Sequence, residues 1–342
     1  MVKFCIGIDF SKKTFDATVI PCDDLESRGI HREFRNTLDG MGRMLRWVLE
    51  STGSSDYGDM LFCGEDTGLY SKTVSDGLAA KGCFMWLESA LRIKRSLGIS
   101  RGKDDRKDSR EIALYAARFR DKARRHVLPD KHVDALKMLF MRRRFLVGQL
   151  KALRQRSKEA VAVLGDCKEL ESSFLSDGRL INAFLREIAR VEKKIRELVD
   201  ASRQVSRSYR ILTSMKGIGM VNAVALIVYT GNFSKFDYDA RRIASFWGVA
   251  PFGRQSGTSL NTTPHVSHYA DKYLKSLLSE AALCAMRFCP VIKEYAGRLL
   301  ARGKHPSVVK NNVKNKMLHI LVAMVRDGRM FQENISKAEE AA

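Results

Sequence analysis

The chain has 342 residues, 45% of them hydrophobic, so it is long enough for about two domains with cores of their own. Lys and Arg number 60 against 39 Asp and Glu, which gives a formal net charge of +21. An excess of this size indicates a polyanionic partner, because phosphates neutralised by Lys or Arg release condensed counterions. Nucleic acid is the leading candidate.

The apolar runs are far shorter than the roughly 20 residues that cross a bilayer, and no signal peptide precedes the first strand-like run. The seven cysteines are scattered, odd in number and never spaced C-x-x-C. This usage predicts reduced thiols and neither a disulfide framework nor a zinc site. We therefore expect a cytoplasmic protein that has no membrane partner.

The positive charge is concentrated between Leu91 and Ser157, where 21 Lys and Arg stand against seven Asp and Glu. This local excess of 14 is two-thirds of the surplus of the whole chain. A run of charge often marks a solvated helical surface. Here it contains three consecutive arginines, Arg142 to Arg144, and adjoins a cluster of acids, which favours a surface that binds nucleic acid.

The first part of the chain predicts a mixed α/β sheet. Residues 3–20 form two strand-like runs separated by a polar turn at residues 11–13, and a third strand is expected at Ile30–Phe34. Helices and strands then alternate, with helices expected at Leu38–Glu50 and Tyr70–Lys81 and strands at Asp59–Gly64 and Cys83–Leu87. An antiparallel start followed by this alternation is typical of ribonuclease-H-like folds, here over residues 1–130.

The middle of the chain, residues 131–204, predicts a helical coiled-coil arm. Apolar residues recur at helical spacing over Val133–Leu164 and again over Leu180–Val199, with Lys, Arg and Glu between them. Turn-like residues lie between the two stretches, including Ser176–Gly178. Two such helices either pack within one chain or pair with another subunit, and the sequence does not choose between these arrangements.

Residues 205–342 predict a second, mostly helical domain. The expected helices are Tyr209–Ser214, Met220–Thr230, Asp239–Trp247, Lys272–Cys289, Val291–Ala301 and Pro306–Asp327. Between the third and the fourth lies a stretch rich in Gly, Ser, Thr and Asn, Gly253–Pro264, which favours turns.

Four acids are candidates for a metal site. Asp9 closes the first strand and Glu65 another, while Asp105 and Asp108 open a helix with i, i+3 spacing, which places both on one face. Carboxylates converging in this way suit a pair of hard divalent ions that stabilise the attacking and leaving oxygens of phosphoryl transfer. Acids in a first helical turn also have a structural use, because they interact with the helix dipole. Nearby acids that spacing does not exclude are Asp16, Asp66, Glu88 and Asp104.

The motifs of this first part resemble those of the DEDD transposases of insertion sequences, also called bridge recombinases, and of the related Piv-type DNA invertases. The family's opening G-I-D-x-(S/A)-K is similar to Gly7-Ile8-Asp9-Phe10-Ser11-Lys12, and its E-x-T-G-x-Y to Glu65-Asp66-Thr67-Gly68-Leu69-Tyr70. Its K-T-D-x-x-D-A is similar to Lys103-Asp104-Asp105-Arg106-Lys107-Asp108-Ser109, which selects Asp105 over Asp104.

The resemblance continues in the second domain. Leu212–Gly219 is similar to the family's helix-hairpin-helix entry, with Lys216 where the family usually has Pro. Phe246–Ser259 resembles G-L-x-P followed by a serine-glycine turn, so the family's nucleophile corresponds to Ser256. The arginines that commonly follow this serine are missing, which leaves as candidates for a phosphate clamp Arg254, His265, His268 and Lys272.

Without the family resemblance, ordinary structural roles explain these residues equally well or better. Ser256, like Ser259, sits in a polar segment where a surface turn needs nothing more than an exposed hydroxyl. A serine becomes a nucleophile only when a base or a metal activates it. Gly217 and Gly219, before the helix that begins at Met220, either present backbone N–H groups to a phosphate or form a tight turn between packed helices.

The resemblance implies a DNA transposase or site-specific recombinase with an N-terminal RuvC-like domain. It implies that Mg²⁺ held by Asp9, Glu65, Asp105 and Asp108 organises the scissile phosphate while Ser256 attacks it and forms a phosphoserine link. Family members assemble as homo-oligomers, dimers or tetramers, with the metal cluster of one protomer facing the serine of another. The insertion-sequence branch uses a non-coding bridge RNA, so DNA and RNA are both expected partners.

Two other interpretations remain open. A RuvC-like metal-dependent nuclease, or a DNA invertase without an RNA guide, would keep the fold; in the nuclease the carboxylates would activate water. A non-catalytic protein that binds nucleic acid would use the acids only structurally. Trapping of a covalent protein–DNA adduct separates the first of these from a serine recombinase, and substitution of Glu65 or Asp105 tests the second.

Overall fold

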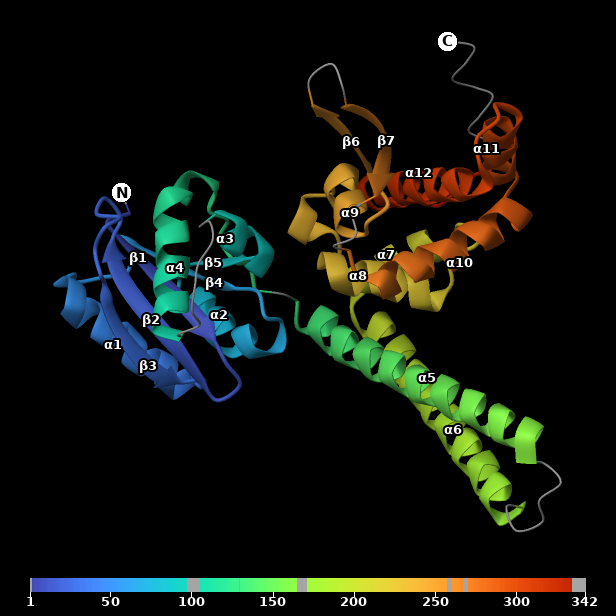
Figure 1. The fold of residues 1–342 in the computed structure, drawn as a ribbon, viewed down its shortest axis with the longest axis horizontal. Coiled ribbons are helices and arrows are strands. Elements are labelled where there is room, and N and C mark those ends of the chain that lie inside the picture. The colour runs from blue at the N-terminus through green and yellow to red at the C-terminus, as the bar shows by residue number, and fades with distance from the viewer. Residues whose placement is uncertain are drawn as a thin grey trace. The chain divides into compact units, whose positions relative to one another are not determined.

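The computed structural model describes residues 2–96, 105–128, 130–164, 171–256, 260–266 and 270–333, with the backbone alone at residues 105, 171, 252–256 and 260–265. The chain divides into two compact units, residues 1–128 and residues 129–342 (Figure 1). We call them the first and the second unit, and each is described by itself.

The first unit is built on a five-stranded sheet with the order β3-β2-β1-β4-β5. Its strands are β1 Phe4–Phe10, β2 Thr14–Pro21, β3 Ile30–Arg35, β4 Met60–Glu65 and β5 Phe84–Glu88. β2 pairs antiparallel with both β1 and β3, whereas β1, β4 and β5 run parallel. This is the mixed ribonuclease-H-like (RuvC-like) sheet that the sequence predicts, and it confirms the expected α/β fold of the first part.

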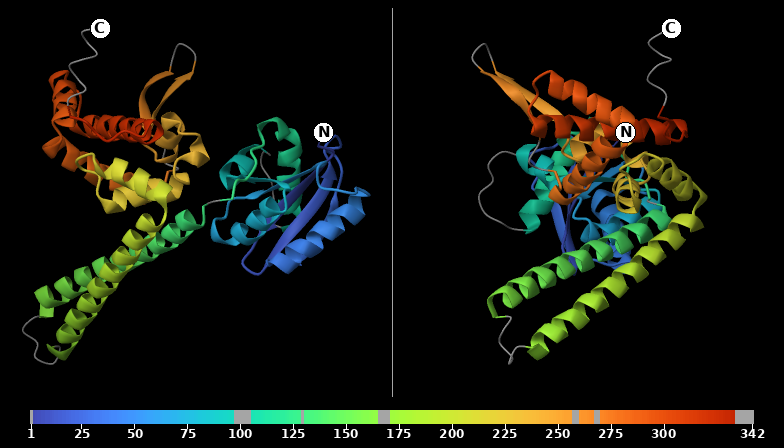
Figure 2. Two further views of the ribbon diagram at one scale, coloured as in Figure 1. Left: turned by 180° about the vertical axis from the view of Figure 1, so that it is seen from behind. Right: turned by 90° about the vertical axis from the view of Figure 1, so that its right-hand side faces the viewer.

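Helices cover both faces of this sheet because its central strands are apolar on both sides. Ile6, Ile8 and Phe10 of β1 face a core shared with two helices, α1 Leu38–Thr52 and α2 Leu69–Ala80. Cys5, on the other face, belongs to a core with α3 Ala90–Ser96 and α4 Asp105–Arg118. α4 lies in front of the sheet in Figure 1, and α1 lies in front of it in the reversed view of Figure 2.

A glycine allows α4 to lie directly on β1. A Cβ atom on Gly7 would come within 2.1 Å of the Ser109 carbonyl oxygen and 2.3 Å of the Ala113 nitrogen. Any side chain at this position would therefore push the helix off the strand. The buried hydroxyl groups of Thr18 and Ser109, whose oxygens are 2.7 Å apart, hold the same turn of α4 against β2.

The prediction that every cysteine is a free thiol was wrong for one pair. Cys5 at the start of β1 and Cys22 just beyond β2 are both buried and are joined as a disulfide, with Cα atoms 5.6 Å apart. The antiparallel register of β1 with β2 places the two residues side by side, which spacing along the chain does not reveal. Cys63, Cys83, Cys284 and Cys289 are free.

The second unit begins with the predicted helical arm, the long antiparallel pair of Figure 1. Its helices are α5 Lys131–Leu164 and α6 Glu171–Ala201. Apolar residues at helical spacing, such as Leu136 and Leu146 on α5 and Val191 and Ile195 on α6, are buried in the core of this unit. The packing of the two helices within one chain follows the first of the two arrangements that the sequence leaves open.

The core of the arm continues without a break into the remaining helices of the second unit. These elements are α7 Arg203–Thr213, α8 Met220–Thr230, η3 Ser234–Phe236, α9 Ala240–Phe246, α10 Lys272–Phe288, α11 Pro290–Ala301 and α12 Pro306–Asp327. A two-stranded antiparallel hairpin, β6 Pro251–Ser256 and β7 Leu260–Val266, lies between α9 and α10. The C-terminal part is therefore mostly helical, as expected.

Four elements differ from the predictions. α7 begins at Arg203 and not at Tyr209. α6 begins at Glu171 and not at Leu180, so the turn expected at residues 176–178 is helical, and Asp177 is buried in it. α3 was not anticipated. The Gly, Ser, Thr and Asn stretch forms the β6–β7 hairpin, since an antiparallel ladder needs only backbone groups and alternating side chains, whatever their polarity.

In the part of the chain that the structure describes, no helix has the length and apolar character that a membrane span requires.

Candidate catalytic site

Four acids lie in one row across the sheet of the first unit. Asp9 is opposite Asp16 in the β1–β2 register, and Glu65 is opposite Glu88 in the β4–β5 register. Ile8 pairs with Gly64, so the next residues along these parallel strands, Asp9 and Glu65, are level with one another. The strand ends therefore place Asp16, Asp9, Glu65 and Glu88 side by side at one edge of the sheet.

All four acids are on the face that α4 covers. Side chains alternate along a strand, so Asp9 is on the same face as Gly7, on which α4 rests. Asp16 shares its face with Thr18, which contacts Ser109 of α4. Asp108 lies one residue before this contact, in the first turn of α4, and Asp105 is the first residue of the helix. The side chain of Asp105 is outside the described part of the structure.

Burial and a neighbouring acid both disfavour the charged form of Glu65. Its pKa is raised, first because burial removes the carboxylate from water and also because the charge of Asp108 opposes ionisation. Lys94 of α3 acts in the opposite sense and lowers it. Among the described residues, no hydrogen bond or ion pair engages the Glu65 carboxylate. A cation at this position would relieve both the desolvation and the repulsion.

The two outer acids of the row are held by partners within the protein. Asp16 Oδ1 lies 2.8 Å from His31 Nε2 on β3. Glu88 accepts from the backbone N–H of Ser89 at 2.7 Å and from the Tyr115 hydroxyl at 3.3 Å. Burial, followed by the charge of Glu88, raises the pKa of Tyr115 to about 12, so this hydroxyl stays a donor at neutral pH. These contacts give Asp16 and Glu88 a structural role around the inner pair.

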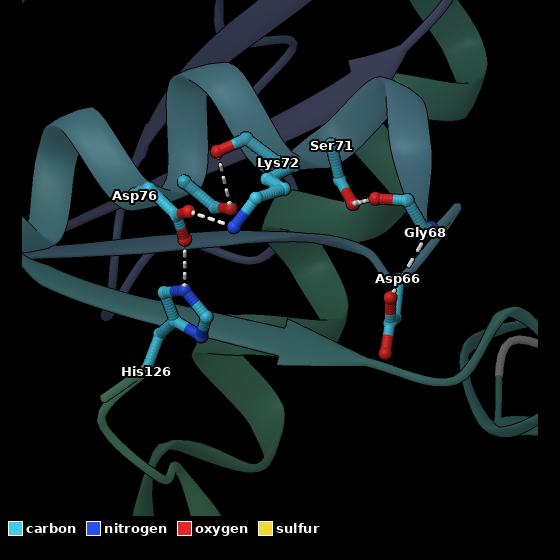
Figure 3. A network of polar contacts seen from close by, with 7 residues as sticks. Asp66, Gly68, Ser71, Lys72, Asp76 and His126 are labelled. Atoms are coloured by element: carbon cyan, nitrogen blue, oxygen red, sulfur yellow. Dashed lines mark hydrogen bonds and ion pairs between the residues drawn. The ribbon is translucent and has the colours of Figure 1, made fainter. Parts of the chain in front are cut away.

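Asp66 has a different task, in the turn that follows β4 (Figure 3). Its Oδ1 atom accepts from the backbone N–H of Gly68 at 3.2 Å, which forms an Asx turn. Gly68 has a positive φ of 72°, a conformation that glycine adopts without strain. In the same view, Asp76 of α2 binds Lys72 at 2.6 Å and His126 at 2.7 Å. Asp66 thus shapes the Glu65–Tyr70 motif and does not belong to the row.

A residue that the sequence did not single out connects the two strand-end motifs. The side-chain amide of Asn36 donates to the Ser11 carbonyl and to the Tyr70 carbonyl, both at 2.8 Å. Ser11 follows the strand of Asp9, and Tyr70 closes the motif that begins at Glu65. Asn36 therefore fixes the loops beyond Asp9 and Glu65 relative to each other. Its place just before α1 carries no motif, so only the structure reveals it.

The inner acids fit a divalent metal ion by their chemistry. Carboxylate oxygens are the ligands that hard cations such as Mg²⁺ prefer, and Asp9, Glu65 and Asp108 supply them from three elements at one edge. Within the described residues, no group of three or more His, Cys, Asp or Glu already has the spacing of a metal site. The fit therefore rests on the donor set and on the raised pKa of Glu65.

Ser256 is the last residue of β6, and its backbone pairs with Leu260, the first residue of β7. It stands next to the tip of the hairpin, in the second unit, whereas the acids belong to the first. Of the expected phosphate-clamp residues, Arg254 and His265 lie on the two hairpin strands, and Lys272 begins α10 and is exposed. His268 and Ser259 lie outside the described residues.

The glycine turn before α8 has a packing role at its first glycine. Gly217 has a φ of 98°, and a Cβ atom there would approach the Ala281 carbonyl oxygen to 2.7 Å. This close contact with α10 matches the structural alternative for Gly217. Gly219 precedes the first residue of α8 and has open space around its Cα.

The three consecutive arginines are engaged within the second unit. Arg142 pairs with Glu187 at 2.8 Å and Arg143 with Glu192 at 2.7 Å, which joins α5 to α6. Arg144 lies 3.4 Å from Asp271 and 4.2 Å from the ring centre of Tyr273. Each guanidinium therefore has a carboxylate partner, while the Arg142 side chain remains 59% exposed, so the binding of nucleic acid by this run stays a prediction. Other exposed cations of α5 lie farther along the helix, at Lys151, Arg154, Arg156 and Lys158.

Comparison with protein families gives two matches that together span most of the chain. Residues 6–164 match a family model described as a transposase and named for the DEDD signature and IS110. Residues 209–297 match a model described as the transposase IS116/IS110/IS902 family. The first match contains all four acids of the proposed metal set, and the second contains Ser256.

Individual relatives agree with these matches. The chain is 24% identical to a pilin gene-inverting protein of Moraxella bovis over 340 residues, which covers 98% of this chain and 99% of that protein. A pilin gene-inverting protein of Moraxella lacunata has the same identity and coverage. An insertion element IS110 uncharacterized 43.6 kDa protein of Streptomyces coelicolor is 31% identical over 132 residues, 39% of this chain and 32% of that protein.

Proposed function

Because the chain belongs to the IS110 family of transposases, and is therefore a DNA recombinase or transposase, we propose that it cuts and rejoins DNA by metal-dependent phosphoryl transfer through a phosphoserine intermediate. The proposed metal binding is supported mainly by the position of Asp9 and Glu65, which lie level on neighbouring strands and on the sheet face that α4 covers. The charge of Asp108, on α4, also opposes ionisation of Glu65. This arrangement concentrates hard oxygen donors where three elements meet.

In this proposal Asp9, Glu65, Asp105 and Asp108 hold Mg²⁺. Bound there, the metal supplies Lewis-acid stabilisation of the charge that develops on the attacking and leaving oxygens of the phosphate. The chain itself provides the alignment: α4 is seated on Gly7 and pinned by the Thr18–Ser109 contact, so Asp108 is held above the strand ends. The Asn36 amide fixes the loops that follow Asp9 and Glu65.

Ser256 is the proposed nucleophile. Its Oγ atom attacks the scissile phosphorus as its proton leaves to a base, the bond from phosphorus to the departing strand breaks, and a phosphoserine ester forms. Attack by the hydroxyl group of a new strand then restores Ser256, so the bond energy is kept for rejoining. The position of Ser256 at the end of a β-strand, beside the hairpin tip, supports this role because the ladder fixes the backbone that presents it.

Both inversion and transposition are compatible with this chemistry. The full-length match to two pilin gene-inverting proteins supports DNA inversion, and the matches to insertion-element proteins support transposition. The same cutting and rejoining inverts a segment when two sites face each other on one molecule, and moves it when the sites are on different molecules. A plasmid assay that carries the DNA flanking the gene in both arrangements distinguishes the two outcomes.

The basic segment, residues 91–157, is proposed to hold DNA together with a non-coding bridge RNA. Its support is the local excess of 14 positive charges between residues 91 and 157 and the exposed cations Lys151, Arg154 and Arg156 of α5. Sequencing of the RNA that copurifies with the protein tests the RNA part. Recovery of one defined transcript from the flanking non-coding DNA is the expected result, and recovery of bulk cellular RNA alone would contradict it.

We also propose that the protein works as a homo-oligomer, a dimer or tetramer, assembled through the arm. Large apolar side chains remain exposed along both helices, among them Phe145 at 61%, Val163 at 79% and Leu175 at 63%. An exposed apolar series on a helical arm is typical of an association surface. Light scattering of the full chain, with Phe145→Ser and Leu175→Ser as variants, is expected to show a smaller assembly for the variants.

The metal proposal is tested by strand cleavage. Glu65→Gln and Asp108→Asn are expected to abolish metal-dependent cleavage of DNA while the variants still bind DNA, because binding depends on the basic segment. Asp66→Asn serves as a matched control, since Asp66 shapes a turn by accepting a hydrogen bond that an Asn side chain also accepts. Retention of full cleavage by Glu65→Gln would refute the assignment.

A further inference from the structure

A lysine is buried between two helices of the second unit, and no described residue gives it a negatively charged partner. Lys314 of α12 is 6% exposed, and its Nζ atom makes one hydrogen bond to a described residue, to Ser279 Oγ of α10 at 3.4 Å. Buried lysines are rare in folded proteins unless they are paired. The environment of Lys314 therefore calls for an explanation.

The surroundings of Lys314 add positive charge. Lys310 lies one turn earlier on α12, and Lys275 lies one turn before Ser279 on α10, and both are half-buried. Burial, and then the charges of Lys275 and Lys310, lower the pKa of Lys314 to about 8. In the described part of the chain, none of these three lysines forms an ion pair with a carboxylate. Lys275 and Ser279 on α10 thus face Lys310 and Lys314 on α12, and this cluster of positive charge has no carboxylate partner among the described residues.

The same turn of α12 supports the hairpin that carries Ser256. Asn311, the neighbour of Lys310, donates from its side-chain amide to the Val249 carbonyl at 3.0 Å. Val249 lies two residues before the start of β6, the strand that ends at Ser256. The positive cluster is therefore built into the helix turn that anchors the base of this hairpin.

We propose that Lys275, Lys310 and Lys314, with Ser279, form a binding site for a phosphodiester group of the DNA backbone. The two half-buried lysines contact the phosphate, and Lys314 adds its charge from behind them. A phosphate supplies the missing negative charge and accepts hydrogen bonds from lysine ammonium groups. The choice of DNA rests on the proposed function of the hairpin; the need for an anion rests on the lysines alone.

The stretch between Ser256 and Lys272 contains no Lys or Arg. The lysines of α10 and α12 supply positive charge within the same unit. Because lysine contacts to the backbone carry no base information, the site holds DNA in position without reading its sequence.

Binding of a fluorescein-labelled DNA duplex, followed by anisotropy across a range of NaCl concentrations, tests the proposal on the full chain. Lys310→Met removes one phosphate contact and is expected to make the salt slope shallower by about 0.9. Lys314→Met is expected to weaken binding and also to raise the melting temperature without DNA, because it removes a buried charge. The matched control is Lys293→Met on α11, an exposed lysine of the same unit, which is expected to change the slope less.

The proposed site would be overturned if Lys310→Met and Lys314→Met had the same salt slopes and affinities as Lys293→Met while their melting curves showed folded proteins. A loss seen with RNA of the same length but not with the DNA duplex would overturn the assignment to DNA. Because the readout is binding, it is independent of the Ser256 chemistry: a protein that forms no covalent adduct but shows the changed slopes would keep this site and lose the proposed function.

Discussion

Thr18 Oγ1 and Ser109 Oγ lie 2.7 Å apart in a fully buried contact that joins β2 to α4. Ser109 directly follows Asp108, so this contact fixes the position of Asp108 relative to the strand ends. The hydroxyl of Ser109 also lies 3.1 Å from the Arg106 carbonyl, whereas the Thr18 hydroxyl has no other hydrogen bond to a described residue. The two sides of the contact are therefore not equivalent.

Ser109→Ala is expected to cost about 1–3 kcal/mol of the free energy of unfolding, because it leaves the buried Thr18 hydroxyl without a partner. Thr18→Val is expected to cost less, since Ser109 keeps its contact with the Arg106 carbonyl. Urea denaturation of both single variants and the double variant measures this. Equal losses from the two single variants would show that the contact does not work in this way.

Gly7→Ala is expected to disrupt the packing of α4 on β1. The added Cβ atom would meet backbone atoms of Ser109 and Ala113 at 2.1 and 2.3 Å, and neither can move unless the helix moves. Overpacking of this kind costs about 1–3 kcal/mol or more. Cleavage of DNA should be lost even where the variant remains folded. The control is Gly42→Ala on α1, where a Cβ atom would meet no other atom within 4 Å.

The raised pKa of Glu65 predicts a dependence of stability on pH. A carboxyl whose pKa is higher in the folded than in the unfolded protein binds more protons when folded, so its contribution to stability is lost as pH rises through the folded pKa. In EDTA, the melting temperature of the parent protein should therefore fall over this range more than that of Glu65→Gln. Addition of Mg²⁺ should remove the difference by stabilising the ionised parent. If the melting temperature fell equally in the parent protein and in Glu65→Gln, the pKa of Glu65 would not be raised in the folded protein.

The exposed cations of α5 are a better test of nucleic-acid binding than the run of three arginines. Lys151→Glu, Arg154→Glu and Arg156→Glu combined should weaken DNA binding and make the salt slope shallower by about 0.9 for each phosphate contact that is lost. Arg142→Glu should instead lower stability, because it places two acids together where Arg142 now pairs with Glu187. If the triple variant bound DNA as well as the parent protein does, these cations of the arm would not be part of the surface that binds nucleic acid.

Much of the fold was predictable because its signals are local. Strand alternation and helical spacing predicted β1 to β5 and the two arm helices, and the acids expected at two strand ends, Asp9 and Glu65, marked the edge of the sheet. Relationships across the chain were not predictable in this way. The Cys5–Cys22 disulfide depends on the strand register, and the lack of an anionic partner for Lys314 depends on the packing of α10 against α12.

The acids illustrate where sequence reasoning stops. Spacing alone did not separate Asp9 from Asp16 or Glu65 from Glu88, and the structure places all four in one row. The outer two have polar partners, His31 and Tyr115, which come from distant segments. A polar hairpin such as β6–β7 is equally hard to foresee, because its composition is that of a turn.

Trapping of the covalent intermediate tests the central proposal most directly. With nicked DNA and a divalent metal, the parent protein should give a protein–DNA adduct on denaturing gels, and Ser256→Ala should give none while still binding DNA. Ser259→Ala, three residues away, should keep the adduct. An adduct that persists in Ser256→Ala, or hydrolysed DNA without any adduct in the parent protein, would contradict the serine mechanism.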